Sequence, residues 1–414
     1  MSAKFLEGPI LHLPSVHFDD GADSLASADD KYPEIEAGYK KLSRRSLLMA
    51  GAKDAVIVDK LPDKEYLALL SACGAGGATR LAPASGDGSS LAEDAAFCPA
   101  TLDFIRSWPH KIEPYMMSSH EERLEEAIGR PLTGVSAQVT SLLNDKVFFT
   151  RLVEDLGLPF IETFIGPPDS AAVRIAKGGN DPVIVRGSKS VGGAAVWTAQ
   201  DSGQRLALGK KIERMRGGMF IVQPLIESES SPNLQFYVGS QRSCLLGGTV
   251  QIFNNRFAHT GNYFDFVNDE STANSLLSQG KALAREAAGI GYRGILGVDF
   301  IVAGETVYAV ELNARHNTST HALWFVNRFF NGDPFSLMEP GRAAYMRFSS
   351  PLDATGQQWI ELLGEHAFNP DTGTGIMPYD CGAGALEAVI AGEDSDHRKW
   401  LMKHAEDIAL SEKI

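Results

Sequence analysis

Three oxygen-bearing side chains in the second half of the chain have the types and spacing of a metal site. Asp299 lies in one apolar run, and Glu311 and Asn313 lie near the end of the next. The short segment 303–306, Ala-Gly-Glu-Thr, predicts a tight turn between two antiparallel strands. Glu311 and Asn313 then share one face of their strand, and pairing about the turn can bring Asp299 beside them. Such a set favours a hard divalent cation such as Mg²⁺, which usually also binds substrate phosphates.

Arg315 follows Asn313 by two residues and falls on the same face of the predicted strand. Its planar guanidinium suits a phosphate or a developing oxyanion. Any one of these four polar residues alone would most often be a solvated strand-end residue. Four together, at matched spacing in apolar strands, favour a site for phosphate chemistry.

The elements that would position this site are visible upstream. A helix is predicted from about residue 143 to Leu156, where Gly157 and Pro159 end it. Strands and a further helix are then predicted at 160–164, 183–186, 220–222 and 275–289. The Gly-rich segment 187–193 follows the second strand and could fold its backbone N–H groups around phosphate, although a plain hairpin or linker has the same composition.

The two ends of the chain have different patterns. Residues 1–35 are polar and acidic, and we expect a loosely ordered segment. Strand signals at 55–58 and 78–82 flank a helix that Asp63 would cap, which predicts a small parallel α/β domain. Residues 350–414 show a helix–loop–helix pattern.

Composition excludes several classes of protein. With 414 residues, the chain is long enough for two or three subdomains. A formal net charge of −14 without a basic stripe argues against nucleic acid as a partner. The four scattered cysteines suggest neither a zinc site nor disulfides. The chain shows no signal-peptide pattern and no apolar run of membrane-spanning length, so we expect a cytoplasmic protein that does not contact membranes.

The ordered set of motifs over about residues 140–325 resembles the ATP-grasp superfamily. The resemblance implies an α/β (α+β) protein in which two α+β subdomains hold ATP between them, behind an N-terminal pre-ATP-grasp α/β domain. The expected divisions are a loosely ordered segment (1–35), the pre-ATP-grasp domain (36–138), the small subdomain with its Gly-rich loop (139–225), and the large subdomain with the metal site and a C-terminal extension (226–414).

The resemblance also implies roles for particular residues. Asp299, Glu311 and Asn313 would hold the Mg²⁺ (or Mn²⁺) of the bound ATP. Arg186 stands where most members carry a phosphate-binding Lys. Pro224 has no N–H, so the backbone donor to adenine would come from Leu225. Glu227 would bind the ribose, with Glu229 as a competing candidate. The full set expected to contact ATP is Lys146, Arg186, Lys189, Ser190, Gly192, Gly193, Gln223, Leu225 and Glu227.

The segment from Arg315 to His321 resembles a subgroup of ATP-grasp ligases that join small acids or amino acids to amines, including natural-product peptide ligases. The implied partners are a small carboxylate and an amine, joined through an acyl phosphate that Arg315 would stabilise. His321 would orient substrate or move a proton, although a structural histidine is an equal alternative. Thr249, Gln251, Arg256 and Asn262 are polar candidates near the substrate, without an assigned role. Dimerisation is common in the superfamily, and a homodimer is possible here.

Two alternative functions remain open at this point. A small-molecule kinase on the same fold would stop after phosphoryl transfer. A non-catalytic nucleotide-binding regulator would have little reason to keep the whole Asp-Glu-Asn set. A dehydrogenase is disfavoured because no Gly-x-Gly-x-x-Gly lies between a strand and a helix.

Overall fold

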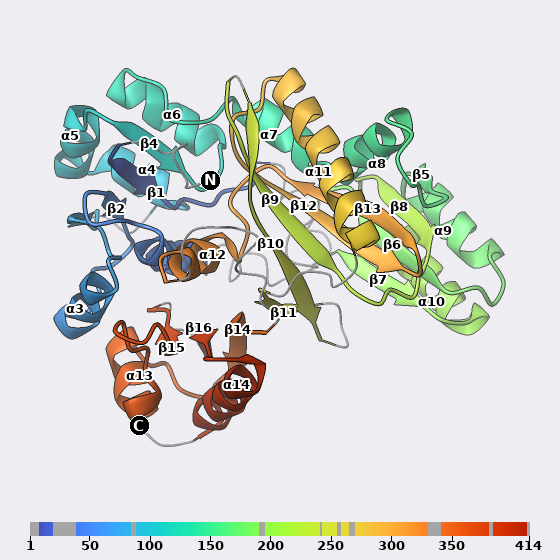
Figure 1. The fold of residues 1–414 in the computed structure, drawn as a ribbon. Helices are drawn as coiled ribbons and strands as arrows, with labels where there is room; N and C mark the ends of the chain where they lie inside the picture. The colour runs from blue at the N-terminus through green and yellow to red at the C-terminus, as the bar shows by residue number, and fades with distance from the viewer. Residues whose placement is uncertain are drawn as a thin grey trace.

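The computed structural model describes residues 8–19, 39–83, 88–189, 195–240, 242–254, 258–264, 270–329, 341–380 and 384–411. Within these ranges the chain forms three β-sheets with helices packed on them (Figure 1). No described helix has the length and apolar character needed to cross a membrane.

The N-terminal region is built on a parallel four-stranded sheet of order β3-β2-β1-β4. Its strands are β1 (Ile10–Leu13), β2 (Ala55–Ile57), β3 (Thr79–Leu81) and β4 (Lys111–Pro114). Around it lie a 3₁₀ helix η2 (Leu42–Leu48) and the helices α3 (Lys64–Ala72), α4 (Leu91–Phe97), α5 (Pro99–Ser107) and α6 (Ser119–Ile128). The predicted parallel α/β domain is therefore present.

The prediction that residues 1–35 form a loosely ordered segment is wrong for the residues around Ile10. Strand β1 lies inside the parallel sheet, hydrogen-bonded to β2 on one side and β4 on the other, and all four of its residues are buried. The polar, acidic composition of the surrounding segment masked this short run. Strand β4 was also not predicted, because four residues between two helices are too few to show a period.

A second sheet is antiparallel, with the order β5-β8-β6-β7. It comprises β5 (Phe164–Gly166), β6 (Val183–Gly187), β7 (Val196–Ala199) and β8 (Phe220–Pro224). Helices α9 (Pro168–Lys177) and α10 (Ser202–Glu213) share its hydrophobic core. The strand predicted at 160–164 begins only at Phe164, whereas the other two strand predictions agree with β6 and β8.

Two helices that precede this small sheet pack elsewhere. Helices α7 (Ala137–Asn144) and α8 (Lys146–Asp155) place Leu143, Phe149 and Val153 in the core of the large sheet. Residues 139 to about 156 therefore pack with the large sheet, although the predicted small subdomain begins at 139. The predicted helix end is confirmed, because Gly157 has a φ of 62° just after α8.

The large sheet has eight strands in the order β13-β12-β9-β10-β11-β14-β16-β15, all pairs antiparallel. Its strands are β9 (Pro232–Val238), β10 (Ser243–Phe253), β11 (His259–Tyr263), β12 (Gly294–Ala303), β13 (Thr306–Asn313), β14 (Ala343–Ser349), β15 (Gly375–Pro378) and β16 (Ala385–Ala391). The associated helices are α11 (Glu270–Ile290), α12 (Thr320–Asn327), α13 (Gly356–Leu363) and α14 (Ser395–Ala409), with a short 3₁₀ helix η4 (Gly364–His366).

The helix–loop–helix prediction for residues 350–414 is therefore incomplete. Its two helices exist as α13 and α14, but β15 and β16 lie between them and extend the large sheet. Every residue of both strands is buried, so neither shows the apolar–polar alternation that identifies a half-exposed strand.

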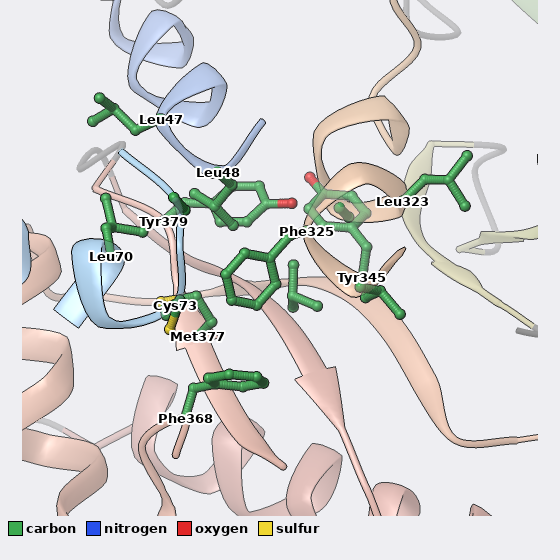
Figure 2. Close-up of a cluster of buried hydrophobic side chains, with 14 of the residues drawn as sticks. Leu47, Leu48, Leu70, Cys73, Leu323, Phe325, Tyr345, Phe368, Met377 and Tyr379 are labelled. Carbon is green, nitrogen blue, oxygen red and sulfur yellow. The ribbon is translucent and has the colours of Figure 1, made fainter. Parts of the chain in front are cut away.

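One hydrophobic cluster joins the two ends of the chain (Figure 2). Leu47, Leu48 and Leu70 come from the N-terminal region and pack with Phe325 of α12 and Met377 of β15. Burial of a large apolar side chain contributes about 1.5–3 kcal/mol, so a shared cluster of this kind couples the stability of both regions. The N-terminal region is thereby held against the large sheet.

Candidate functional site

The predicted metal-site hairpin is present as β12 and β13. The two strands pair with Asp299 opposite Glu311 and Gly297 opposite Asn313, and a bulge follows Asp299. At the turn Gly304 has a φ of 57°, a conformation that glycine adopts without strain. The hairpin therefore brings the three predicted metal ligands to one face of the sheet.

Asp299 accepts hydrogen bonds from three side-chain amides. The amide nitrogens of Asn233 and Gln251 donate to its Oδ1, each at 2.6 Å, and Asn313 Nδ2 donates to its Oδ2 at 2.9 Å. Burial, with the nearby charge of Glu311, raises the pKa of Asp299 to about 6. Two carboxylates held this close in a partly desolvated site favour a bound cation.

The residues present fit a hard divalent cation. Two carboxylates and one amide oxygen are the oxygen donors that Mg²⁺ prefers, and substrate phosphates usually complete its shell. Asn313 Oδ1 accepts a hydrogen bond from Arg315 Nη2 at 2.6 Å. To bind a cation, the amide of Asn313 would turn so that this oxygen faces the cation. Within the described residues, no group of three or more His, Cys, Asp or Glu side chains could hold a metal, so a site here depends on Asn313 as third ligand.

Lys146 reaches the same point from helix α8. The Asp145 side chain caps this helix by accepting from the N–H groups of Val147 (2.7 Å) and Phe148 (3.3 Å). Lys146 Nζ lies 2.8 Å from Glu311 Oε1, although 165 residues separate the two in sequence. The cap therefore positions a cation beside the metal-site carboxylate.

Arg186 and Gln223 form the opposite side of the site on strands β6 and β8. Arg186 Nη1 donates to the Val310 carbonyl at 3.0 Å, and Nη2 donates to Gln223 Oε1 at 2.8 Å. Burial lowers the pKa of Arg186, and the charge of Glu311 acts against that shift. A guanidinium thus lies at the join between the small sheet and the metal-site hairpin.

These residues line one cavity of about 380 Å³ between the small and large sheets. Of the residues predicted to act at the site, its lining contains Lys146, Arg186, Gln223, Leu225, Asp299, Glu311, Asn313 and Arg315. Apolar side chains such as Ile184 and Val196 cover part of the wall. A volume of this size is typical of a small-molecule site.

The structure places two predicted residues away from this cavity. His321 is only 2% exposed and lies in the core, with its ring 5.1 Å from that of Tyr379 and 6.3 Å from that of Tyr345. It is absent from the described lining of the cavity, and this placement fits the structural alternative for His321. Glu227 is exposed and also absent from that lining, whereas its competitor Glu229 accepts from the Gly304 N–H at 3.1 Å.

Leu225 is in the described lining of the cavity, but its backbone N–H has a different partner from the one predicted. The Leu225 N–H, expected to face adenine, instead donates to the Pro182 carbonyl at 3.0 Å, because the β6–β8 ladder continues to this point. Lys189 is described and partly buried but is not part of the described cavity lining. Ser190, Gly192 and Gly193 of the Gly-rich loop, and Arg256, lie outside the described residues.

Sequence reasoning did not single out Asn233. It is 2% exposed within β9, whose seven residues are all buried, and it contacts Asp299. The carboxamides of Asn233 and Gln235 within the mainly apolar strand β9 were the available signal, because buried polar groups usually have a specific partner. Gln251 and Asn262, which had no assigned role, also line the cavity.

Comparison with known proteins agrees with this geometry. Residues 143–319 match the family described as "ATP-grasp domain". The chain contains an ATP-grasp domain. The matched range begins in α7 and ends just past Arg315, so it includes every residue of the hairpin site and Lys146.

The curated relatives of this chain are distant and longer. The carbamoyl phosphate synthase large chain of Myxococcus xanthus (strain DK1622) is 25% identical over 195 residues, covering 46% of this chain and 18% of the relative. The same enzyme chain of Paenarthrobacter aurescens (strain TC1) is 22% identical over 266 residues, covering 63% of this chain and 23% of the relative. The chain thus spans less than a quarter of the length of these relatives.

Solved structures resemble nearly the whole chain in fold. Biotin carboxylase from Campylobacter jejuni has a TM-score of 0.60 at 14% identity, covering 99% of this chain and 93% of that one. N5-carboxyaminoimidazole synthetase from Staphylococcus aureus, complexed with ADP, has a TM-score of 0.56 at 12% identity, covering 96% and 97%. The likeness therefore extends to the N-terminal sheet and the C-terminal strands.

Proposed function

We propose that this chain is an ADP-forming ligase that joins a small carboxylic acid or amino acid to an amine through an acyl phosphate. The observation that supports this most is the meeting of Lys146, Arg315 and the Asp299–Glu311–Asn313 set in one cavity of an ATP-grasp domain. The carbamoyl phosphate synthase chains and the N5-carboxyaminoimidazole synthetase structure named above support the same class of chemistry.

The first step places the substrate carboxylate against the γ-phosphate of ATP. Its oxygen forms a bond to phosphorus as the bond to the β-phosphate oxygen breaks, giving an acyl phosphate and ADP. Lys146 and Arg186 hold the phosphates from two sides. Mg²⁺ (or Mn²⁺) held by Asp299, Glu311 and Asn313 supplies neutralisation of the phosphate charge when bound.

The second step is attack of the amine on the acyl carbonyl. Arg315 lies beside Asn313 and lines the cavity, so its guanidinium can stabilise the acyl phosphate and then the tetrahedral oxyanion. The C–N bond forms and phosphate leaves with the electron pair of the C–O bond. Exclusion of water matters here because an acyl phosphate hydrolyses readily.

A panel assay tests this function. ADP and phosphate release from Mg-ATP is measured with amino acids and small carboxylic acids, each with and without a second amine. We expect release that needs both an acid and an amine, with an amide product detected by mass. A stable phosphorylated product formed from one substrate would instead show a kinase. If both active substrates are amino acids, the result would favour natural-product peptide ligation.

Glu311→Gln tests the metal-site assignment. The substitution keeps the shape of the side chain but removes the charge that faces Lys146 and the cation, so we expect ADP release to fall by about 100-fold or more. Glu365→Gln, at a side chain that is 88% exposed, is the matched control. Wild-type turnover by a correctly folded Glu311→Gln protein would refute the assignment.

A further inference from the structure

One ionisable side chain of the cavity is not used by the phosphate and metal contacts. The ionisable side chains in the described lining are Lys146, Arg186, Asp299, Glu311, Arg315 and His259. The first five form the nucleotide and metal half of the cavity. His259 lies on strand β11 of the same large sheet, which is paired between β10 and β14 (Figure 1).

A β-bulge turns His259 toward the cavity. Gln251 pairs with Asn262 and Phe253 pairs with His259, so Thr260 is an extra residue on β11. His259 and Asn262 are three residues apart, so in a regular strand their side chains would point to opposite faces of the sheet. The bulge places both on the face that carries Gln251, and all of these paired side chains line the cavity.

A chain of hydrogen bonds sets the proton position on the His259 ring. Asn262 Nδ2 donates to Thr249 Oγ1 at 2.9 Å, so its amide oxygen faces the ring, where Oδ1 lies 2.8 Å from His259 Nε2. With the amide in this orientation, the Nε2–H tautomer is the one that completes the hydrogen bond, with Nε2 donating to Oδ1. In the neutral ring this leaves Nδ1 with a lone pair that can accept a proton.

Packing holds the ring and favours its neutral form. Tyr345 of β14 stacks on it at 6.2 Å between centroids, and Phe253 meets it edge-on at 6.0 Å. Gly261 permits this close approach of β11 and β14, because a Cβ there would lie 2.4 Å from the Tyr345 carbonyl.

The charges around His259 act in both directions. Burial lowers its pKa from the ordinary value of 6.5, while the Asn262 hydrogen bond and the charge of Glu387 on β16 act to raise it. The guanidiniums of Arg45 (η2) and Arg347 (β14) act to lower it further. The net direction is downward, so the ring is neutral at pH 7 and able to accept a proton.

We propose that His259 accepts the proton that the amine substrate loses during amide formation. This inference rests on the proposed function. The amine nitrogen forms its bond to the acyl carbon, one N–H proton moves to His259 Nδ1, and phosphate leaves with the electrons of the broken C–O bond. The imidazolium then releases its proton to phosphate or solvent, which restores the neutral ring.

The other ionisable groups of the described lining are poorly suited to this role. Glu311 faces Lys146, and Asp299 accepts from three amides and would bind the cation. Lys146, Arg186 and Arg315 are cations at neutral pH and have no lone pair to offer. His259 is therefore the uncharged base among the ionisable groups of the described lining.

Separate measurement of the two half-reactions tests the proposal. Hydroxylamine is a strong nucleophile that traps acyl phosphates even without an enzymic base. Glycinamide is a weaker nucleophile, so its attack depends more on a base that takes the N–H proton. For His259→Gln we expect amide formation with glycinamide to fall by about 100-fold or more, and hydroxamate formation to fall far less. His366→Gln, outside the cavity on η4, is the control.

The outcomes separate the two proposals. Equal loss of hydroxamate and amide in His259→Gln would assign the residue a structural role, and unchanged amide formation would overturn the inference outright. Absence of any hydroxamate from wild-type protein with every acid of the panel would instead contradict the proposed ligase function.

A second measurement, of the tautomer and charge of the His259 ring, needs no substrate and does not depend on whether the His259→Gln protein folds. In ¹⁵N-histidine NMR spectra of the wild-type protein, we expect a neutral Nε2–H tautomer at pH 7 for the His259 ring, which stacks on Tyr345, whereas His321 meets that ring edge-on. Its titration midpoint should lie below 6.5. A ring that carries its hydrogen on Nδ1, or that is charged at pH 7, would overturn the inference.

Discussion

Asp299 is the residue at which the demands of folding and of the proposed chemistry conflict most. Its carboxylate is held among three amides and close to Glu311, and this environment raises its pKa to about 6 from 3.8. A carboxyl group with a raised pKa in the folded state stabilises the fold below its unfolded pKa. That stabilisation is lost as the pH rises through the folded value.

The pH dependence of stability tests this environment. The unfolding free energies of Asp299→Asn and of wild type are compared without divalent cations. Relative to wild type, we expect the variant to become more stable as the pH rises from 4 to 7. The expected shift is roughly 1–3 kcal/mol, because one pKa unit corresponds to about 1.4 kcal/mol. Urea denaturation at several pH values measures it, and a difference that does not change with pH would contradict the assigned pKa.

At the level of elements, helix α8 acts mainly through its first residue. The Asp145 cap begins the helix and thereby fixes where Lys146 projects, beside Glu311. The same device occurs on α10, where Asp201 accepts from the Gln204 N–H at 2.8 Å, but no residue of α10 is in the described lining of the cavity.

These two caps form a matched pair of variants. Asp145→Ala and Asp201→Ala should each lower the unfolding free energy by about 1 kcal/mol, because each loses one side-chain cap. Only Asp145→Ala should also weaken Mg-ATP binding, by roughly 10-fold, since it releases the start of the helix that carries Lys146. Calorimetric titration with Mg-ATP distinguishes them, and equal affinity in both variants would show that the cap does not position Lys146.

At the scale of the whole molecule, a buried ion pair supplements the hydrophobic cluster that joins the chain's two ends. Arg45 of η2 donates to Glu387 Oε2 of β16, and the Tyr345 hydroxyl donates to the same oxygen at 3.1 Å. Arg45 is 7% exposed and Glu387 is 4% exposed. The N-terminal region and the last strands of the large sheet therefore share a charged contact, and His259 lies on the other side of Tyr345.

Removing the charge of Glu387 should destabilise the whole chain. Glu387→Gln leaves Arg45 buried without its counter-ion, for which we expect a loss of about 3–5 kcal/mol. Arg347→Ala is the control, because Arg347 contacts the same carboxylate at 3.5 Å but is 55% exposed, and its loss should cost less than about 1 kcal/mol. Similar losses for the two variants, measured by urea denaturation, would contradict the importance of the buried pair.

Local pattern alone determined several parts of this protein. The turn at 303–306, with apolar runs on either side, predicted the β12–β13 hairpin, and the period of two placed Glu311 and Asn313 on one face. Gly157 and Pro159 correctly marked the end of α8. These features depend on residues close in sequence, so the sequence carries them directly.

Tertiary structure decided the contacts between distant segments. Sequence patterns could not show that β1 lies inside a sheet, that β15 and β16 extend another, or that α7 and α8 pack on the large sheet. They also could not separate His321, which is in the core, from His259, which a bulge turns into the cavity. Burial and facing depend on which strands meet across more than a hundred residues, and only the packed chain determines that.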